Sequence, residues 1–265
     1  MIGVSLRMSA HPLAPDWLVP PADANALAPE VWPRSAQRDA DGVLAIGGAS
    51  TLALAEQFGT PVLVLDEAEV RRRAAEALAA FTGAAARRGT QARVYYAGKA
   101  FLSTEVARWV TEEGLAVDVC SRGELEVALA AGGAPARIGS HGNNKSVSEL
   151  ERAVSVGVGS IVLDSSIELE RLAAITERLG VVQNVLVRVN SGVHAETHHF
   201  LATAHEDQKF GLTLEDAGPA VARIRELDGL EFRGLHCHIG SQIFGVAGFR
   251  ESASRVLELH ATLLE

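Results

Sequence analysis

Short apolar runs rich in β-branched residues alternate with longer amphipathic stretches along most of this chain. The runs cover residues 61–67, 93–99, 115–120, 136–140, 160–164, 184–190 and 232–239. Each run has the length of a strand, and each stretch between them is long enough for a helix. Strands that alternate with helices in this way predict parallel βαβ units.

Serine–glutamate pairs mark the expected beginnings of three of these helices. In a capping box, a serine at the N-cap and a glutamate three residues later satisfy backbone N–H groups reciprocally. The spacing occurs at three pairs: Ser121 with Glu124, Ser146 with Glu149, and Ser165 with Glu168. We therefore expect a helix to begin at each serine, directly after a predicted strand or loop.

Polar residues within the strands favour a (β/α) barrel over an open, doubly wound sheet. In residues 184–190 Arg188 lies on one strand face, while three valines share the other. Asp118, His236 and His238 likewise lie opposite apolar neighbours. One face therefore becomes polar toward the C-terminal end of each strand, as the interior of a barrel does around an active site.

The predicted barrel is incomplete, and a different kind of segment precedes it. A closed barrel of this class has about eight strands. About six strong candidate strands follow residues 61–67, and that run is a candidate for a seventh strand or for a strand of a different sheet. Residues 1–60 hold most of the nine prolines and two of the three tryptophans. We expect residues 1–60 to be extended and irregular, in part as a component of a β-domain, and residues 61–265 to form the barrel.

Composition excludes several classes of protein. The 48% hydrophobic and 22% charged content is that of a soluble globular protein. A net charge of −9 argues against a nucleic-acid partner, and the absence of a signal-peptide core or membrane-spanning run predicts a cytoplasmic protein without a membrane partner. Cys120 and Cys237 each lie in an apolar run, which predicts two buried free thiols in a reducing compartment.

One lysine ends the apolar, aromatic stretch "VYYAGKAF" at residues 94–101. A lysine held in a desolvated pocket has a lowered pKa and can form a Schiff base with a carbonyl group. The alternative for Lys99 is a structural ion pair inside the barrel, with Asp118 as the obvious partner. Asp118 and Arg188 are both expected to point inward, where a buried ion pair would also lie near the site.

The stretch "HCHIGSQ" at residues 236–242 places His236 and His238 on one strand face, followed by Gly240 and Ser241. Such a histidine pair can bind a metal ion, although no aspartate or glutamate follows closely. Alternatively, an imidazole can stack on a planar aromatic ring while the Gly-Ser turn receives a phosphate at a helix start. A core histidine would have neither role.

Two loops supply weaker candidates. The stretch "HGNNKS" at residues 141–146 contains His141 and Asn143, and short loops of this kind at a barrel rim often approach ligands. A long insertion at residues 193–211 is rich in histidine, and His194 and His198 have the helical spacing of metal ligands. We favour a solvated active-site loop over a metal site for this insertion.

Six stretches taken together resemble the fold-type III, pyridoxal-phosphate-dependent decarboxylases. They are "YYAGKAF", "VDVCSRGELEVALAAG", "HGNNKS", "RVNSGVHAETHHF", "DQKFGL" and "HCHIGSQIF", in the order of that family. The resemblance implies that the cofactor is pyridoxal 5′-phosphate and that Lys99 holds it covalently. It also implies that His238 stacks on the pyridine ring and that Ser241, next to Gly240, lies at the phosphate.

The same resemblance gives other residues less specific places. Asp118, Glu124 and Arg188 match polar positions of the inner rim, and His141 and Asn143 lie near the site. Among family members, the motifs are most similar to those that decarboxylate meso-2,6-diaminoheptanedioate at its D-centre to L-lysine, the last step of lysine biosynthesis. Full-length members form homodimers with shared active sites, so we expect a homodimer for the full-length enzyme.

Two stretches depart from the family pattern. Gln208 stands where many members have serine, and "SGV" replaces a commoner Pro-Gly-Val. A non-catalytic cofactor-binding or partner-binding relative, another basic amino-acid decarboxylase and a metal-dependent hydrolase are the rival functions. Because the strand count stops short and later family motifs are missing, we expect this chain to be an N-terminal portion with turnover well below about 1 per second.

Overall fold

The chain divides between Glu69 and Val70 into two units, residues 1–69 and 70–265. The structure, a computed structural model, describes residues 23, 25–29, 31–193, 210–241, 243 and 245–264. Among these residues, no helix combines the length and the hydropathy that crossing a bilayer requires.

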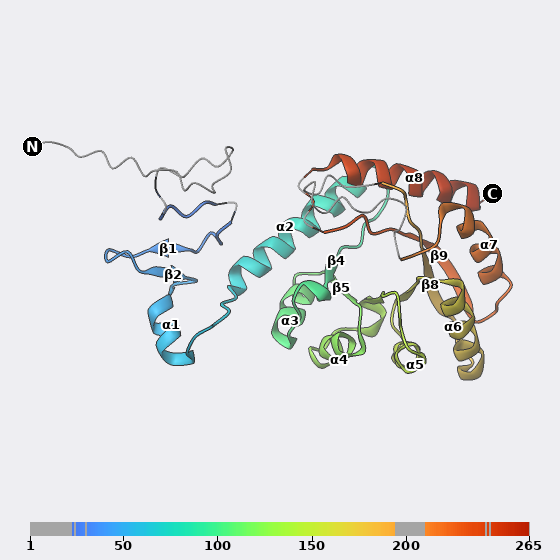
Figure 1. Ribbon diagram of the computed structural model, residues 1–265, viewed down its shortest axis with the longest axis horizontal. Coiled ribbons are helices and arrows are strands. Elements are labelled where there is room, and N and C mark those ends of the chain that lie inside the picture. Colours follow the sequence, from blue (N-terminus) through green and yellow to red (C-terminus); the bar gives the residue numbers. More distant parts are fainter. Residues whose placement is uncertain are drawn as a thin grey trace, which may run out of the picture. The chain divides into compact units, whose positions relative to one another are not determined.

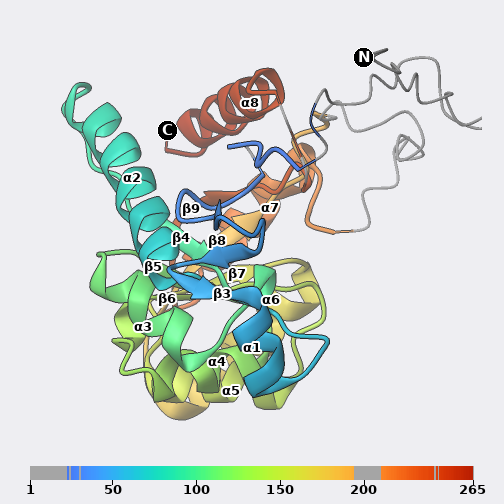
Figure 2. The same cartoon turned by 90° about the vertical axis from the view of Figure 1, so that its left-hand side faces the viewer.

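The first unit contains a small antiparallel sheet, where the sequence predicted an extended, irregular segment that in part joins a β-domain. Strands β1 (Gln37–Arg38), β2 (Leu44–Ile46) and β3 (Ala49–Ser50) pair in that order. Strand β3 runs directly into helix α1 (Thr51–Phe58) (Figure 2). The turn between β2 and β3 uses two glycines with positive φ, which accounts for the tight reversal.

The strand predicted at residues 61–67 does not form, and that prediction was wrong. Helix α2 (Glu67–Ala86) begins at the end of this run. The backbone N–H of Glu69 donates to a carboxylate oxygen of Asp66 at 3.3 Å, so the aspartate acts as a helix cap. The apolar run therefore ends where the helix begins, and the Leu63 side chain within the run is exposed.

The second unit is built on six parallel strands. They are β4 (Tyr95–Ala97), β5 (Ala116–Val119), β6 (Ile138–Ser140), β7 (Ser160–Leu163), β8 (Gln183–Arg188) and β9 (Leu230–His236). Each strand pairs with its neighbour in sequence, so the strand order never reverses as it does in a doubly wound sheet. This order confirms the predicted barrel-type sheet of about six strands, which does not close within the described residues.

Helices connect the strands and pack against the apolar face of the sheet (Figure 1). The connecting helices are α3 (Thr104–Glu112), α4 (Arg122–Ala130), α5 (Val147–Val156), α6 (Ser166–Leu179) and α7 (Leu214–Arg225), and α8 (Ala247–Leu264) follows the last strand. Two short 3₁₀ helices flank strands: η1 (Gly98–Ala100) directly follows β4, and η2 (Pro135–Arg137) directly precedes β6.

The serines predicted to cap α4, α5 and α6 do so, because each side chain accepts a hydrogen bond from the N–H three residues on. Only Ser146 and Glu149 complete the reciprocal capping box. Glu124 and Glu168 instead accept from the N–H of the residue before the cap. Their carboxylates therefore lie closer to the ends of the strands than a capping box would place them.

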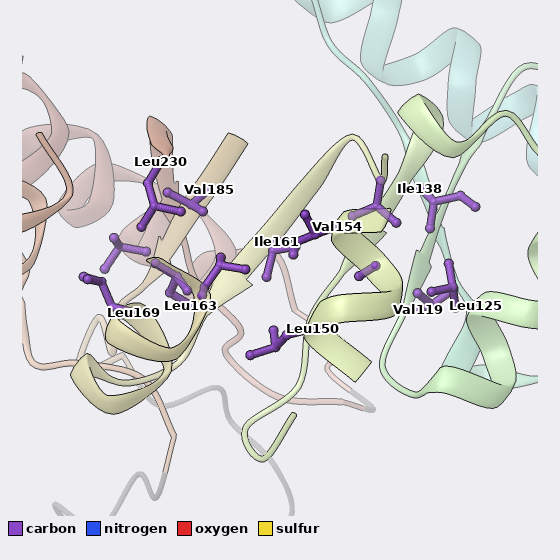
Figure 3. Close-up of a cluster of buried hydrophobic side chains, with 14 of the residues drawn as sticks. Val119, Leu125, Ile138, Leu150, Val154, Ile161, Leu163, Leu169, Val185 and Leu230 are labelled. Carbon is purple, nitrogen blue, oxygen red and sulfur yellow. The ribbon is translucent and has the colours of Figure 1, made fainter. Parts of the chain in front are cut away.

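The core lies between the sheet and its helices, and Figure 3 shows its strand valines and isoleucines facing helix leucines. Val185, Val187 and Val189 are at most 1% exposed, as the alternation along β8 predicted. Burying one such side chain contributes about 1.5–3 kcal/mol. Because the apolar face is committed to the helices, the polar side chains of the strands occupy the opposite face.

Candidate functional site

Polar side chains gather at the C-terminal ends of the parallel strands. The register places Ala97 opposite Asp118 and Arg188 opposite His236. Partial desolvation, and then the positive charges of Lys99 and Arg188, lower the pKa of His238. Lys99 follows β4 and His238 follows β9, so each lies at the C-terminal end of a parallel strand.

Lys99 lies on η1, directly after β4, where the sequence predicted it. The turn approaches β5 so closely that a Cβ on Gly98 would meet the carbonyl oxygen of Asp118 at 3.0 Å and Glu124 Oε2 at 3.2 Å. A side chain at this position would press on the backbone of β5, which favours glycine before the lysine.

The Lys99 side chain is exposed, which corrects the prediction of a desolvated pocket. It also forms no ion pair with Asp118 or with any other described residue. The reason is that β4 is an edge strand of the sheet, so no described strand covers the outer side of this turn.

Asp118 pairs with His141 instead. The Nδ1 atom of His141 lies 2.8 Å from Asp118 Oδ2, and the backbone N–H of His141 donates to the Val119 carbonyl at 2.8 Å. The His141 side chain is only 8% exposed. A predicted near-site residue is thereby locked between the end of β5 and the end of β6.

His236 stacks on His141, with ring centroids 6.5 Å apart and an interplanar angle of 22°. Burial lowers the pKa of His236 to about 4, so its ring is neutral near pH 7. Its Nδ1 atom is buried without a hydrogen-bond partner among the described residues. His236 is therefore an inner member of the rim, whereas His238, two residues further along, is exposed.

Arg188 pairs with Asp164, so the ion pair considered between Arg188 and Asp118 does not form. The guanidinium donates to Asp164 Oδ1 at 2.9 Å, and the backbone N–H of Gly211 donates to Oδ2 at 3.1 Å. The guanidinium also lies 5.3 Å from the centre of the Phe210 ring, a cation–π distance. The sequence contained a signal for this pair, because Asp164 ends the strand run next to that of Arg188.

Glu124 binds Cys120 at the beginning of α4. One carboxylate oxygen accepts from the Cys120 N–H at 2.8 Å, and the other lies 3.2 Å from the thiol sulfur. Burial and the neighbouring carboxylate raise the pKa of the thiol to about 11. Both cysteines are free but only half-buried, which corrects the prediction of two buried thiols. Cys120 contacts Glu124 at the beginning of α4, whereas the sulfur of Cys237 lies 3.4 Å from the Ser252 hydroxyl of α8.

We expect the Cys120 thiol to react on the order of a hundredfold more slowly with iodoacetamide at pH 8 than an ordinary cysteine, because the thiolate is the nucleophile. Its rate should rise only as the pH approaches the raised pKa of about 11. Glu124→Gln keeps an acceptor for the Cys120 N–H but removes the charge, so alkylation should become faster. An unchanged rate in that variant, measured by peptide mass spectrometry, would contradict the assigned cause.

The remaining predicted site residues fall into two groups, those exposed at the strand ends and those outside the described residues. Asn143, Gly240 and Ser241 are solvent-exposed at the same ends of the strands. His194, His198 and Gln208 lie outside the described residues. Within the described part of the chain, no three His, Cys, Asp or Glu side chains gather in a group that could hold a metal ion.

The parallel barrel-type sheet with a lysine at its C-terminal rim defines a class of protein. The chain belongs to the family described as "Pyridoxal-dependent decarboxylase, pyridoxal binding domain", whose model matches residues 67–264. Pyridoxal phosphate is therefore the cofactor of this domain.

The chain is similar in sequence to diaminopimelate decarboxylases. The diaminopimelate decarboxylase of Mycobacterium leprae is 53% identical over 252 residues, which cover 94% of this chain and 52% of that protein. That of Mycobacterium tuberculosis H37Rv is 55% identical over 236 residues, or 88% of this chain and 51% of that protein. The chain thus spans about half the length of the curated relatives it matches.

Solved structures agree with this relationship. The diaminopimelate decarboxylase of M. jannaschii in complex with L-lysine aligns with a TM-score of 0.79 at 28% identity, covering 88% of this chain and 54% of that one. A protein from Aquifex aeolicus aligns with a TM-score of 0.74 at 30% identity, covering 87% and 52%.

The residues at the rim fit a pyridoxal group. The Lys99 amine is exposed and forms no ion pair with a described residue, so it is accessible to a carbonyl carbon. The neutral ring of His236 and the lowered pKa of His238 allow imidazoles to approach an aromatic ring without a full charge. The buried, unpartnered Nδ1 of His236 also leaves a polar atom for a group beyond the protein.

Among the two histidines, we expect His238→Ala to weaken pyridoxal-phosphate binding more than His236→Ala does, by about three- to tenfold. The exposed His238 lies nearer the end of the strand, whereas the His236 ring is already stacked on His141. Titration of each variant with the cofactor, followed by absorbance, measures both dissociation constants. A larger loss for His236→Ala would contradict the placement.

Proposed function

We propose that this chain provides the cofactor-binding domain of a decarboxylase that converts meso-2,6-diaminoheptanedioate to L-lysine and carbon dioxide. The observation that carries the proposal is the polar rim at the strand ends, where Lys99, Asp118, His141, His236 and His238 lie. The names of the relatives support the substrate, and the L-lysine in the M. jannaschii structure is the product that this reaction yields.

The roles of the rim residues follow from their positions. Lys99 would hold the cofactor covalently, and His238 would stack on its ring. Ser241 and Gly240 would lie at the phosphate. Pyridoxal phosphate, when bound, supplies an electron sink for the carbanion that loss of carbon dioxide leaves behind.

The inner residues would orient this arrangement rather than react. Asp118 holds His141 through Nδ1, which fixes the ring that stacks on His236. Arg188, held by Asp164, keeps a positive charge at the rim that can attract the carboxylates of the substrate. Asn143, exposed in the loop after β6, would offer a polar contact to the bound ligand.

The proposal also covers the domain division, the compartment, the oligomeric state and the partners of the enzyme. Residues 61–265 would act as the cofactor-binding barrel domain, with residues 1–60 as a separate segment. The parent enzyme would be a cytoplasmic homodimer whose partners are small amino acids, since the charge of −9 disfavours nucleic acid.

The proposal is tested by product analysis with the cofactor-loaded chain in stoichiometric amounts, so that slow chemistry is detected. Substrates are the meso and L,L isomers of 2,6-diaminoheptanedioate, L-lysine and L-ornithine, and mass spectrometry identifies the amines formed. We expect L-lysine from the meso isomer alone. Diamines from lysine or ornithine would instead favour another basic amino-acid decarboxylase. Cofactor uptake without product from any substrate would favour a non-catalytic cofactor-binding protein.

A further inference from the structure

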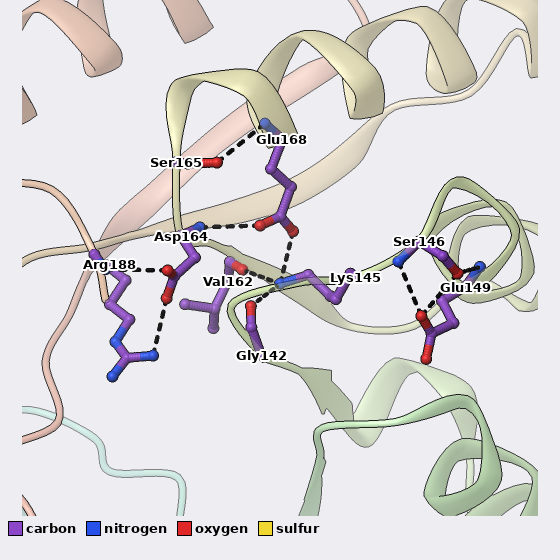
Figure 4. A network of polar contacts seen from close by, with 10 residues as sticks. Gly142, Lys145, Ser146, Glu149, Val162, Asp164, Ser165, Glu168 and Arg188 are labelled. Atoms are coloured by element: carbon purple, nitrogen blue, oxygen red, sulfur yellow. Dashed lines mark hydrogen bonds and ion pairs between the residues drawn. The ribbon is translucent and has the colours of Figure 1, made fainter. Parts of the chain in front are cut away.

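A second lysine at the rim is buried and contacts three oxygen atoms. Lys145 follows β6, and its Nζ donates to the carbonyl oxygens of Gly142 at 2.6 Å and Val162 at 2.8 Å (Figure 4). It also lies 2.6 Å from Glu168 Oε1, and both side chains of this pair are at most 6% exposed. Three oxygen atoms therefore surround the ammonium group, two as hydrogen-bond acceptors and one as the partner of an ion pair.

These contacts cross the shortest ladder of the sheet. Strands β6 and β7 pair over only two residue pairs, from Gly139 opposite Ser160 to Ser140 opposite Ile161. Strands β8 and β9, by comparison, pair over six. Lys145 extends from the loop after β6 to the carbonyl oxygen of Val162 in β7. It therefore connects the two strands beyond their last backbone pair, at the end of the sheet where the site lies.

The same ion pair is part of a longer chain of charged groups. The second carboxylate oxygen of Glu168 accepts from the backbone N–H of Asp164 at 3.2 Å, and Asp164 in turn holds Arg188 (Figure 4). On the other side, the loop that Lys145 closes begins with His141, which pairs with Asp118. The ends of β5, β6, β7 and β8 are therefore connected through side chains.

We propose that Lys145 and Glu168 are positioning residues, whose buried ion pair holds residues 141–145 against β7 and keeps His141 in place for cofactor binding. The part that concerns the cofactor rests on the proposed function. A buried ion pair usually adds little stability over apolar residues of similar volume, because both charges lose their hydration. Its contribution here is the fixed geometry of the loop.

Three variants separate positioning from stability. Lys145→Met removes the ammonium and leaves Glu168 unpaired. The double variant with Glu168→Gln also removes the unpaired charge and keeps an acceptor for the Asp164 N–H. The control is Arg152→Met, which breaks a bidentate pair with Glu126, at 2.8 and 3.0 Å, between the adjacent helices α4 and α5.

Amide hydrogen exchange and the dissociation constant for pyridoxal phosphate are the two measurements. Lys145→Met should speed exchange about tenfold in residues 139–146 and 161–164 while sparing β9, and weaken the cofactor about tenfold. Arg152→Met should leave both within about twofold. The double variant should recover the urea midpoint of unfolding but neither the local protection nor the affinity, because the ammonium contacts are still missing.

Several results would overturn this assignment. Exchange that is unchanged, or that rises uniformly across the sheet, would show that the ion pair does not hold this ladder. Full recovery of cofactor affinity in the double variant would show that the pair contributes stability alone. If the wild-type chain takes up no pyridoxal phosphate, the proposed function fails, while the local exchange pattern still decides whether Lys145 holds the loop.

Discussion

Lys99→Ala is expected to abolish covalent attachment of pyridoxal phosphate to this chain. The sequence contains only three lysines, Lys99, Lys145 and Lys209. Lys145 cannot substitute, because its amine is buried, hydrogen-bonded to two carbonyl oxygens and paired with Glu168. Borohydride reduction of the cofactor-loaded protein, followed by peptide mapping, should place the label on Lys99 in the wild type and nowhere in the variant.

Two controls accompany this experiment. Lys99→Arg keeps the positive charge but lacks a primary amine, so it should also remain unlabelled. Lys145→Met should still be labelled at Lys99, even where its affinity for the cofactor falls. A label on Lys145 or Lys209 of the wild-type protein would contradict the assignment of the cofactor lysine.

Asp164→Ala is expected to lower the free energy of unfolding by about 3–5 kcal/mol, the usual cost of removing one partner from a buried ion pair. The side chains of Asp164 and Arg188 are 7% and 13% exposed, so the guanidinium that remains cannot be fully hydrated. The Gly211 N–H also loses its acceptor. Urea unfolding followed by far-ultraviolet circular dichroism measures the change.

Matched substitutions test whether burial causes this effect. Asp164→Asn retains an oxygen that can accept from Arg188, so its loss should be smaller. Glu170→Ala removes a bidentate partner of Arg223 between α6 and α7, where both side chains are exposed, and should leave the urea midpoint almost unchanged. Equal losses in Asp164→Ala and Glu170→Ala would refute the argument.

From residue 93 onward, the sequence by itself determined the strands and the order in which they follow one another. Alternation along β8 placed the valines in the core and Arg188 on the other face, and the caps at Ser121, Ser146 and Ser165 began the helices as predicted. These features depend on residues a few positions apart, so the local sequence contains the information that they require. The motif containing Lys99 indicated the family for the same reason.

Only the tertiary structure decided which charged groups meet. Asp118 pairs with His141, Arg188 with Asp164 and Lys145 with Glu168, although the sequence suggested other partners or none. Each choice depends on the register between neighbouring strands and on the direction of a loop, which no short pattern contains. Exposure depends on position in the sheet, so Lys99 on the edge strand is open to solvent. Lys145 follows an inner strand, and that position buries it.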